Sequence, residues 1–232
     1  MTRKTSDETA VRLTRRAVVG GLPLFLAACA TARVQPGLAP IDPIYVAMYG
    51  PITTEPYPVP AIDLHKVDRK FWRQQVTYIG DEPPGTIVVY PDEKLLYFVL
   101  EGGQAIRYGV GVSKEGYRNP GNAIVGRKAE WPHWTPTANM IAVKPELRKF
   151  AAGMDGGIGN PLGARALYLY RGGRDTRYRI HGTNEPWTIG HRVSSGCVRM
   201  MNQDIIDLYN RAPVGTRVVV VEDKSDGGRD AT

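Results

Sequence analysis

Short runs of β-branched and aromatic residues, separated by tight turns, constrain the fold of this chain more than any other feature of its sequence. Three such runs occupy residues 86–90, 95–100 and 104–112, and Pro91 and Gly102 mark the turns between them. Strands joined by turns this short pair with their sequence neighbours in an antiparallel meander. We therefore expect a β-sheet to begin near residue 85.

The same signals continue toward the end of the chain and leave room for few helices. Further strands are predicted at residues 123–127, 166–170, 178–180 and 216–221. Asn202 is expected to cap a helix with one apolar face, and residues 68–75 and 146–150 are expected to form short helices. The sequence thus predicts a single mainly β (β-rich α+β) domain over residues 85–222.

The first 28 residues have the layout of an export signal peptide. Arg15 and Arg16 precede an apolar stretch that is too short and too rich in glycine for a good membrane-spanning helix. The arginine pair favours the twin-arginine export route, with an ordinary secretion signal as the alternative. The stretch ends in a sequence that resembles a lipobox, so Cys29 is either lipidated or lies beside a cleavage site. Both interpretations place the mature protein in the periplasm or cell envelope, with or without a lipid anchor.

Residues 29–84 are predicted to be a proline-rich tether and lead-in segment. Seven prolines lie between residues 31 and 60, and proline fixes φ and removes a backbone donor, which favours extended chain. Such a tether would let an anchored domain reach a polymer, and a tail without a role is the alternative. Residues 223–232 are predicted to be a polar C-terminal tail.

The charge and cysteine content exclude some functions. The formal net charge is +7, but part of the excess lies in the export signal, and no Lys/Arg run is interleaved with aromatic residues. We therefore expect no nucleic-acid partner. Cys29 and Cys197 are the two cysteines, so the mature domain has no internal disulfide. A single cysteine in an exported domain is a candidate reactive thiol.

A segment near the C-terminal end holds residues suited to thiol chemistry. A thiol becomes a good nucleophile when it loses its proton, which a nearby imidazole can take. His181 ends a predicted strand, and Cys197 follows sixteen residues later, so the intervening loop can bring the two together. The small residues Ser194, Ser195 and Gly196 leave room for a substrate carbonyl and leave N–H groups free for an oxyanion hole. The spacing alone is weak evidence that His181 and Cys197 form a catalytic pair.

The segment resembles the signature of the L,D-transpeptidase (YkuD-type) catalytic domain family. That signature joins a His-Gly-Thr motif to a later Ser-x-Gly-Cys-Val/Ile-Arg motif. The matching residues here are His181-Gly182-Thr183 and Ser194-Ser195-Gly196-Cys197-Val198-Arg199. The likeness extends to a motif at residues 159–167 and to the helix after the cysteine. It implies one L,D-transpeptidase-like β-sandwich domain with few short helices over residues 85–222.

The resemblance also implies roles for individual residues. Cys197 would be the nucleophile and His181 the general base, with the backbone carbonyl of Gly182 orienting the imidazole. Arg199 would either bind a substrate carboxylate or order the loop. The residues expected to stabilise the oxyanion or to bind substrate are Gly196, Ser194, Ser195, Arg199, Thr183 and Trp187. Many family members carry histidine where this chain has Ser195, which removes a second imidazole but leaves the role of His181 unchanged.

The reaction implied by the resemblance is acyl transfer on peptidoglycan. The donor would be a tetrapeptide stem, a thioester on Cys197 would be the intermediate, and D-Ala would leave. An amine of another stem would give a 3→3 cross-link, and an amine of an envelope protein would anchor that protein. No metal or organic cofactor is expected, and carbapenems would acylate Cys197.

Three alternative functions and one alternative site, for zinc, remain. With water as acceptor the enzyme would be an L,D-carboxypeptidase. A catalytically weak peptidoglycan-binding module would have no need for both His181 and Cys197, and a papain-like cysteine peptidase fits poorly with a histidine that precedes the cysteine. A zinc site built from His181, His191 and Cys197 lacks paired ligand spacing and an evident fourth ligand.

Overall fold

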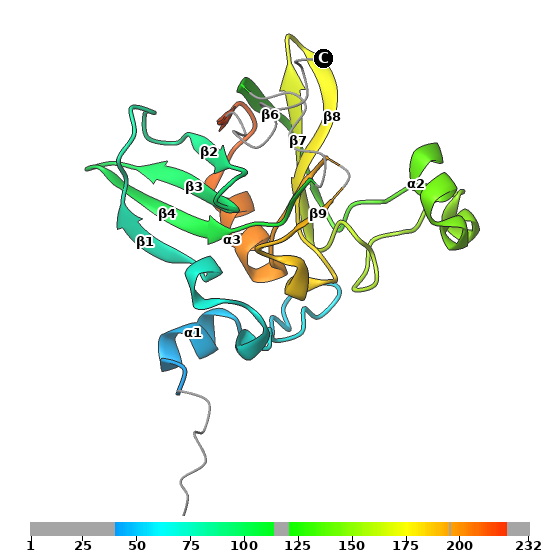
Figure 1. The fold of residues 1–232 in the computed structure, drawn as a ribbon, viewed down its shortest axis with the longest axis horizontal. Helices are drawn as coiled ribbons and strands as arrows, with labels where there is room; N and C mark the ends of the chain where they lie inside the picture. The colour runs from blue at the N-terminus through cyan, green and yellow to red at the C-terminus, as the bar shows by residue number, and fades with distance from the viewer. Residues whose placement is uncertain (1–39, 114–120, 195, 222–232) are drawn as a thin grey trace, which may run out of the picture. The chain divides into compact units, whose positions relative to one another are not determined.

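The computed structural model describes residues 40–113, 121–194 and 196–221 (Figure 1). These residues belong to one compact unit that begins at Pro40. The predicted export signal, Cys29, Ser195 and the predicted tail over residues 223–232 lie outside the described residues. Within the described ranges, no helix has the length and apolar character needed to cross a membrane.

In the described part of the chain, nine strands form one mixed sheet in the order β1-β4-β3-β2-β11-β6-β7-β8-β10. Strands β2, β3 and β4 form the predicted antiparallel meander, and β11 joins it to β6 by pairing parallel to β2. Two short strands, β5 (Val112–Ser113) and β9 (Arg192–Ser194), pair separately. The strands of the large sheet are β1 (Gln74–Thr77), β2 (Ile87–Tyr90), β3 (Leu95–Leu100), β4 (Gln104–Gly109), β6 (Gly121–Glu130), β7 (Arg165–Arg171), β8 (Arg174–His181), β10 (Val198–Arg199) and β11 (Arg217–Val220).

The two halves of this sheet share one hydrophobic core. Figure 1 shows β3 and β4 running in a different direction from β7 and β8, so the sheet is strongly bent. Leu96 on β3 and Leu167 on β7 belong to the same buried cluster, and helix α3 (Asn202–Arg211) adds Ile205 and Leu208 to it. The predicted mainly β (β-rich α+β) fold is therefore confirmed.

The remaining helices are short. The segment expected to be helical at residues 146–150 is the 3₁₀ helix η3 (Pro145–Phe150). Helix α2 was not predicted, although the Thr137 hydroxyl accepts a hydrogen bond from the N–H of Met140 and caps it. The other short helices are α1 (Pro43–Met48), α2 (Ala138–Val143), η1 (Leu64–Lys66), η2 (Arg69–Phe71) and η4 (Pro186–Thr188).

Asn202 does not cap α3, so that prediction is wrong. The residue at the N-cap is Met201, and Asn202 is the first residue of the helix. Its side-chain oxygen accepts a hydrogen bond of 3.0 Å from the N–H of Ala164 instead. A Cβ on Gly163 or Gly182 would overlap that oxygen, so both positions require glycine. Asn202 thus fixes the helix to the segment that leads into β7.

The predicted extended tether is wrong for residues 40–60. These residues fold together with the lead-in, and we call residues 40–77 the N-terminal segment. Pro43 starts α1 rather than an extended chain, and an antiparallel bridge joins Ile52 to Val59. The helix expected at residues 68–75 is replaced by η2 and the start of β1. Apolar residues of the N-terminal segment pack with Ile189 and Met201. Together they form a second buried cluster, made of Tyr49, Leu64, Val67, Phe71, Trp72, Ile189 and Met201.

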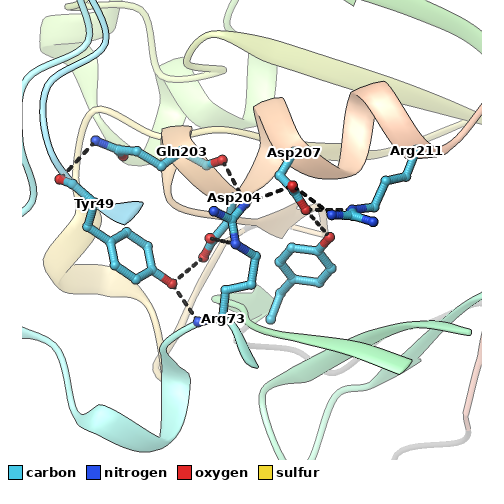
Figure 2. Close-up of polar contacts among 7 residues, drawn as sticks. Tyr49, Arg73, Gln203, Asp204, Asp207 and Arg211 are labelled. Carbon is cyan, nitrogen blue, oxygen red and sulfur yellow. Dashed lines mark hydrogen bonds and ion pairs between the residues drawn. The ribbon is translucent and has the colours of Figure 1, made fainter. Parts of the chain in front are cut away.

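Buried polar contacts attach the N-terminal segment to α3 (Figure 2). The amide nitrogen of Gln203 donates to three carbonyl groups of the segment at 2.9 to 3.4 Å. The Tyr49 hydroxyl donates to Asp204 at 3.2 Å, and a guanidinium nitrogen of Arg73 lies 3.2 Å from Asp207. Burial raises the pKa of Asp204 to about 7. Because these contacts are buried, separating the segment from α3 would leave several of the polar groups without their partners.

Phe71→Ala is expected to lower the free energy of unfolding by about 3 kcal/mol, because a buried ring would leave a cavity. The Phe71 side chain is 6% exposed, and its ring lies against Gly190, where a Cβ would overlap it. Urea denaturation of both proteins measures the difference. The control is Ile79→Ala at a 93% exposed position, where the change should stay within about 0.5 kcal/mol. Equal effects of the two substitutions would contradict the packing described here.

Candidate active site

Parallel pairing of β8 with β10 brings His181 and Cys197 to one face of the sheet. Ile180 pairs with Val198 and both are fully buried in the core. Side chains alternate along a strand, so His181 and Arg199, the next pair, face the opposite side. Cys197 immediately precedes β10 and lies on that same side. The sheet thus places the predicted nucleophile and base in the same pocket.

His181 is buried and held in one orientation. Its Nδ1 lies 2.6 Å from the carbonyl oxygen of Gly182. A carbonyl can only accept, so Nδ1 carries the proton and Nε2 keeps a lone pair. Burial lowers the pKa of His181 to about 4, the charges of Arg199 and Arg179 act in the same direction, and the hydrogen bond to Gly182 opposes them. The imidazole is therefore neutral at pH 7 and able to accept a proton at Nε2.

Cys197 is a half-buried thiol that forms no disulfide among the described residues. Burial raises its pKa, while a hydrogen bond from the backbone N–H of Arg179 and the charges of Arg179 and Arg199 act against the rise. A neutral imidazole and a protonated thiol are thus the resting forms at pH 7. In this arrangement the thiol loses its proton as it attacks, so His181 is suited to act as a general base.

Arg179 is a site residue that the sequence analysis missed. Its guanidinium forms a bidentate pair with Asp175 at 2.7 and 2.8 Å and lies 4.3 Å from the centre of the Tyr168 ring. The only sequence signal was its position two residues before His181 on the same strand, which puts both on one face. The backbone of Arg179 contacts the thiol, and its charge favours a thiolate.

Arg199 is engaged by the loop that follows β8. Its guanidinium lies 3.0 Å from the carboxylate of Glu185, and it also lines the pocket. Of the two roles left open for Arg199, the ion pair favours loop ordering. Thr183 is buried, and its hydroxyl accepts a hydrogen bond from the N–H of Glu185 at 3.0 Å. Thr183 and the 56% exposed Trp187 are not among the residues that line the pocket, and their contact with substrate stays a prediction.

The loop before the cysteine is only partly described. Gly196 has φ 137°, a conformation open to glycine but rarely to other residues, and it lines the pocket. Ser194 ends β9, where its backbone pairs with that of Ser113. The oxyanion role of the N–H groups of Gly196 and Cys197, and the roles of Ser194 and Ser195, stay predictions.

The pocket has a volume of about 670 Å³, which suits a small ligand or a peptide segment. Residues of β8 line one part of the pocket, and another part comes from the segment around α2, including His133, Trp134 and Met140. His133 is exposed and lies 3.2 Å from Asp155. Among the described residues, no three His, Cys, Asp or Glu side chains converge as metal ligands.

Fold and site together define a β-rich protein with a thiol and an imidazole on one wall of a pocket. The family model described as the L,D-transpeptidase catalytic domain matches residues 84–220. This match covers more than half of the chain, and the chain belongs to the L,D-transpeptidase catalytic-domain family.

Individual relatives carry the same family name. YbiS of Escherichia coli (strain K12), named a probable L,D-transpeptidase, is 40% identical over 141 residues, which are 59% of this chain and 44% of YbiS. A Fuscovulum blasticum protein from an ATP synthase subunits region, named as a candidate L,D-transpeptidase, is 33% identical over 65% of this chain and 75% of its own length. The chain therefore spans less than half of YbiS but most of the second relative.

A solved structure is also similar to this chain. It is described as a probable carnitine operon oxidoreductase from Brucella melitensis and is 49% identical. The match covers 68% of this chain and 99% of that chain, with a TM-score of 0.46.

Alkylation of Cys197 by iodoacetamide is expected to accelerate steadily from about pH 6 to about pH 9, because thiolate is the reacting form and burial raises the thiol pKa. The rate is measured by mass spectrometry in a Cys29→Ala background, so that Cys197 is the remaining thiol. The urea-unfolded protein provides the reference for an ordinary cysteine. A rate that is already constant below pH 7 would instead show a preformed thiolate–imidazolium pair.

Proposed function

We propose that this chain is an L,D-transpeptidase that acts on peptidoglycan tetrapeptide stems through a thioester on Cys197. The observation that supports it most is the site itself, in which Gly182 fixes the tautomer of a buried His181 on the wall that also carries Cys197. Family membership supplies the reaction class. The cysteine chemistry and the acceptor belong to the proposal.

The first half-reaction forms the acyl-enzyme. Nε2 of His181 takes the thiol proton while Sγ of Cys197 attacks the carbonyl carbon of the third stem residue. The tetrahedral oxyanion is stabilised by the backbone N–H groups of Gly196 and Cys197. The carbon–nitrogen bond to D-Ala then breaks, and the leaving amine takes the proton from the imidazolium. The product is a thioester on Cys197 and free D-Ala.

The second half-reaction transfers the acyl group to an acceptor. An acceptor amine attacks the thioester, His181 removes the amine proton, and the sulfur leaves and regains a proton from the imidazolium. The side-chain amine of a second stem gives a 3→3 cross-link, and an envelope-protein amine gives an anchored protein. Water in this position would make the enzyme an L,D-carboxypeptidase.

The charge of the pocket suits a substrate that ends in a carboxylate. Arg179 and Arg199 are paired with Asp175 and Glu185. Arg177 also lines the pocket, and within the described ranges no carboxylate pairs with its exposed guanidinium. Arg177 is therefore suited to bind the terminal carboxylate of the tetrapeptide, because a guanidinium can form two parallel hydrogen bonds to a carboxylate.

Product analysis distinguishes the acceptors. The purified protein is incubated with disaccharide-tetrapeptide, and the products are identified by mass spectrometry. D-Ala together with a dimer supports a stem acceptor. D-Ala without a dimer supports water or an absent protein acceptor, and adding a candidate envelope protein separates these two cases. Absence of product and of any adduct with a carbapenem would favour the peptidoglycan-binding module instead.

We further propose that the protein acts in the periplasm or cell envelope, with lipidated Cys29 as an anchor to the membrane. The twin-arginine segment and the lipobox-like sequence support this localisation. The mass of the mature N-terminal peptide from cell envelopes tests it. A mature chain that begins after Cys29, with no lipid attached, would rule out the anchor.

A further inference from the structure

Glu55 of the N-terminal segment reaches into the catalytic domain and pairs with Arg165. The two oxygens of Glu55 lie 2.6 and 2.9 Å from the guanidinium nitrogens of Arg165. The Arg165 side chain is 7% exposed and that of Glu55 11%, so water screens this pair little. Glu130, at 3.8 Å and with a 58% exposed side chain, is a weaker partner for the same guanidinium. Glu55 lies outside the matched catalytic domain, which begins at residue 84.

The backbone of Arg165 continues this contact to the imidazole. The carbonyl oxygen of Arg165 accepts a hydrogen bond of 3.0 Å from the N–H of Gly182. The same Gly182 offers its own carbonyl oxygen to Nδ1 of His181 at 2.6 Å. Two adjacent peptide groups of Gly182 are therefore fixed between Arg165 and His181. A shift of Arg165 would move the carbonyl that sets the orientation of His181.

A second contact of Glu55 reaches the segment that leads to His133 and Trp134, which line the pocket. The indole N–H of Trp131 donates to Glu55 at 2.9 Å, and the Tyr57 ring packs edge-on against the indole. The backbone N–H of Trp131 donates to the carbonyl of Ala164 at 2.8 Å. Trp131 directly precedes the pocket wall that carries His133 and Trp134. The carboxylate of Glu55 thus joins the first residue of β7 to the residue that precedes a pocket-lining loop.

We propose that Glu55 is a positioning residue for His181, acting through Arg165 and the peptide groups of Gly182. The N-terminal segment is then part of the catalytic unit rather than a spacer. A buried guanidinium needs a partner, and the partner supplied by the segment fixes Arg165 in the position that its carbonyl contact to Gly182 requires. The effect on turnover depends on the proposed function, whereas the effect on the imidazole does not.

The test compares Glu55→Gln, Glu55→Asp and Asp63→Asn in the full chain. Asp63 is a matched control, because it is an acidic residue of the same segment whose ion pair with Lys66 is exposed. NMR of histidine-labelled protein reports the Nδ1–H signal and the titration of His181. Glu55→Gln is expected to shift both and to lower kcat for the tetrapeptide about tenfold at an unchanged KM, since small misplacement of a catalytic group slows chemistry. Glu55→Asp should retain part of the rate, and Asp63→Asn should behave like the wild type.

A second variant separates positioning from simple destabilisation. Glu55→Gln leaves a buried charge unpaired, so Glu55→Gln combined with Arg165→Gln is measured as well, because it removes both charges. If both variants fold and both shift the His181 signal, the proposal is supported. If melting temperatures fall while the His181 signal, its titration and kcat stay at wild-type values, the proposal is overturned. A wild type that turns over no tetrapeptide, with variants that still shift the His181 signal, would refute the proposed function and leave this inference standing.

Discussion

Replacing Cys197 with alanine should lower the rate of D-Ala release by at least about 10⁴-fold, because the acyl-enzyme cannot form without the nucleophile. The thiol lies on the same wall of the pocket as His181, and the described residues offer no second cysteine there. Both half-reactions depend on the same sulfur, so release and cross-linking should be lost together. A coupled D-Ala assay and mass spectrometry of the products measure the two.

The Cys197→Ala protein must also be shown to be folded. Removing a half-buried sulfur atom should change the free energy of unfolding by about 1 kcal/mol or less, so urea denaturation should give a curve near that of the wild type. Cys197→Ser is the conservative companion and should also be nearly inactive, because a hydroxyl is a weaker nucleophile than a thiolate. D-Ala release at a tenth or more of the wild-type rate in Cys197→Ala would exclude the thioester route.

His181→Gln should reduce kcat by roughly 10² to 10⁴-fold, the range typical for loss of a general base. The reason is the resting charge state of the site. Since the thiol pKa is raised and the pKa of His181 is lowered to about 4, the attacking sulfur depends on the imidazole for removal of its proton at pH 7. Raising the pH should partly restore the variant, because hydroxide replaces the missing base.

His191→Gln is the matched control for this prediction. His191 lies in the loop between the two catalytic residues, is exposed and does not line the pocket. Its substitution should leave kcat within about twofold, as expected for a surface change. Equal losses in His191→Gln and His181→Gln would refute the assignment of His181 as base.

The same histidine predicts a difference in acid stability. The imidazole has an ordinary pKa of 6.5 when unfolded and about 4 when folded, so the unfolded chain binds the proton first. The contribution of His181 to the free energy of unfolding therefore falls as the pH drops from 6.5 to 4. In urea denaturation at a series of pH values, His181→Gln should not show this fall in the free energy of unfolding. Comparing the two proteins cancels the opposite contribution of Asp204, whose raised pKa is common to both.

The sequence predicted those features that depend on local pattern. The strands at β2, β3 and β7 were recognised from β-branched runs, and the Cys–His pair from motifs in which the relevant residues are close in the chain. The contact of Gly182 with His181 is also local, because it joins adjacent residues. Such signals need no knowledge of how distant segments pair.

The features that were missed depend on distant partners. Strand alternation places Arg179 on the same face as His181, but its contact with Cys197 depends on the register of β8 with β10, which no local pattern specifies. Glu55 and Arg165 are 110 positions apart, and their pairing requires the N-terminal segment to fold back. Prolines in that segment suggested an extended chain, but its spaced apolar residues pack on Ile189 and Met201, and burial decided the conformation.

The mass of the intact protein shows whether a thioester forms on Cys197. Enzyme and tetrapeptide are mixed, quenched in acid at short times and analysed by mass spectrometry. We expect an added mass equal to the stem without D-Ala, located on the Cys197 peptide and released by hydroxylamine. Continued D-Ala release with an unmodified Cys197 peptide at every time point would contradict it.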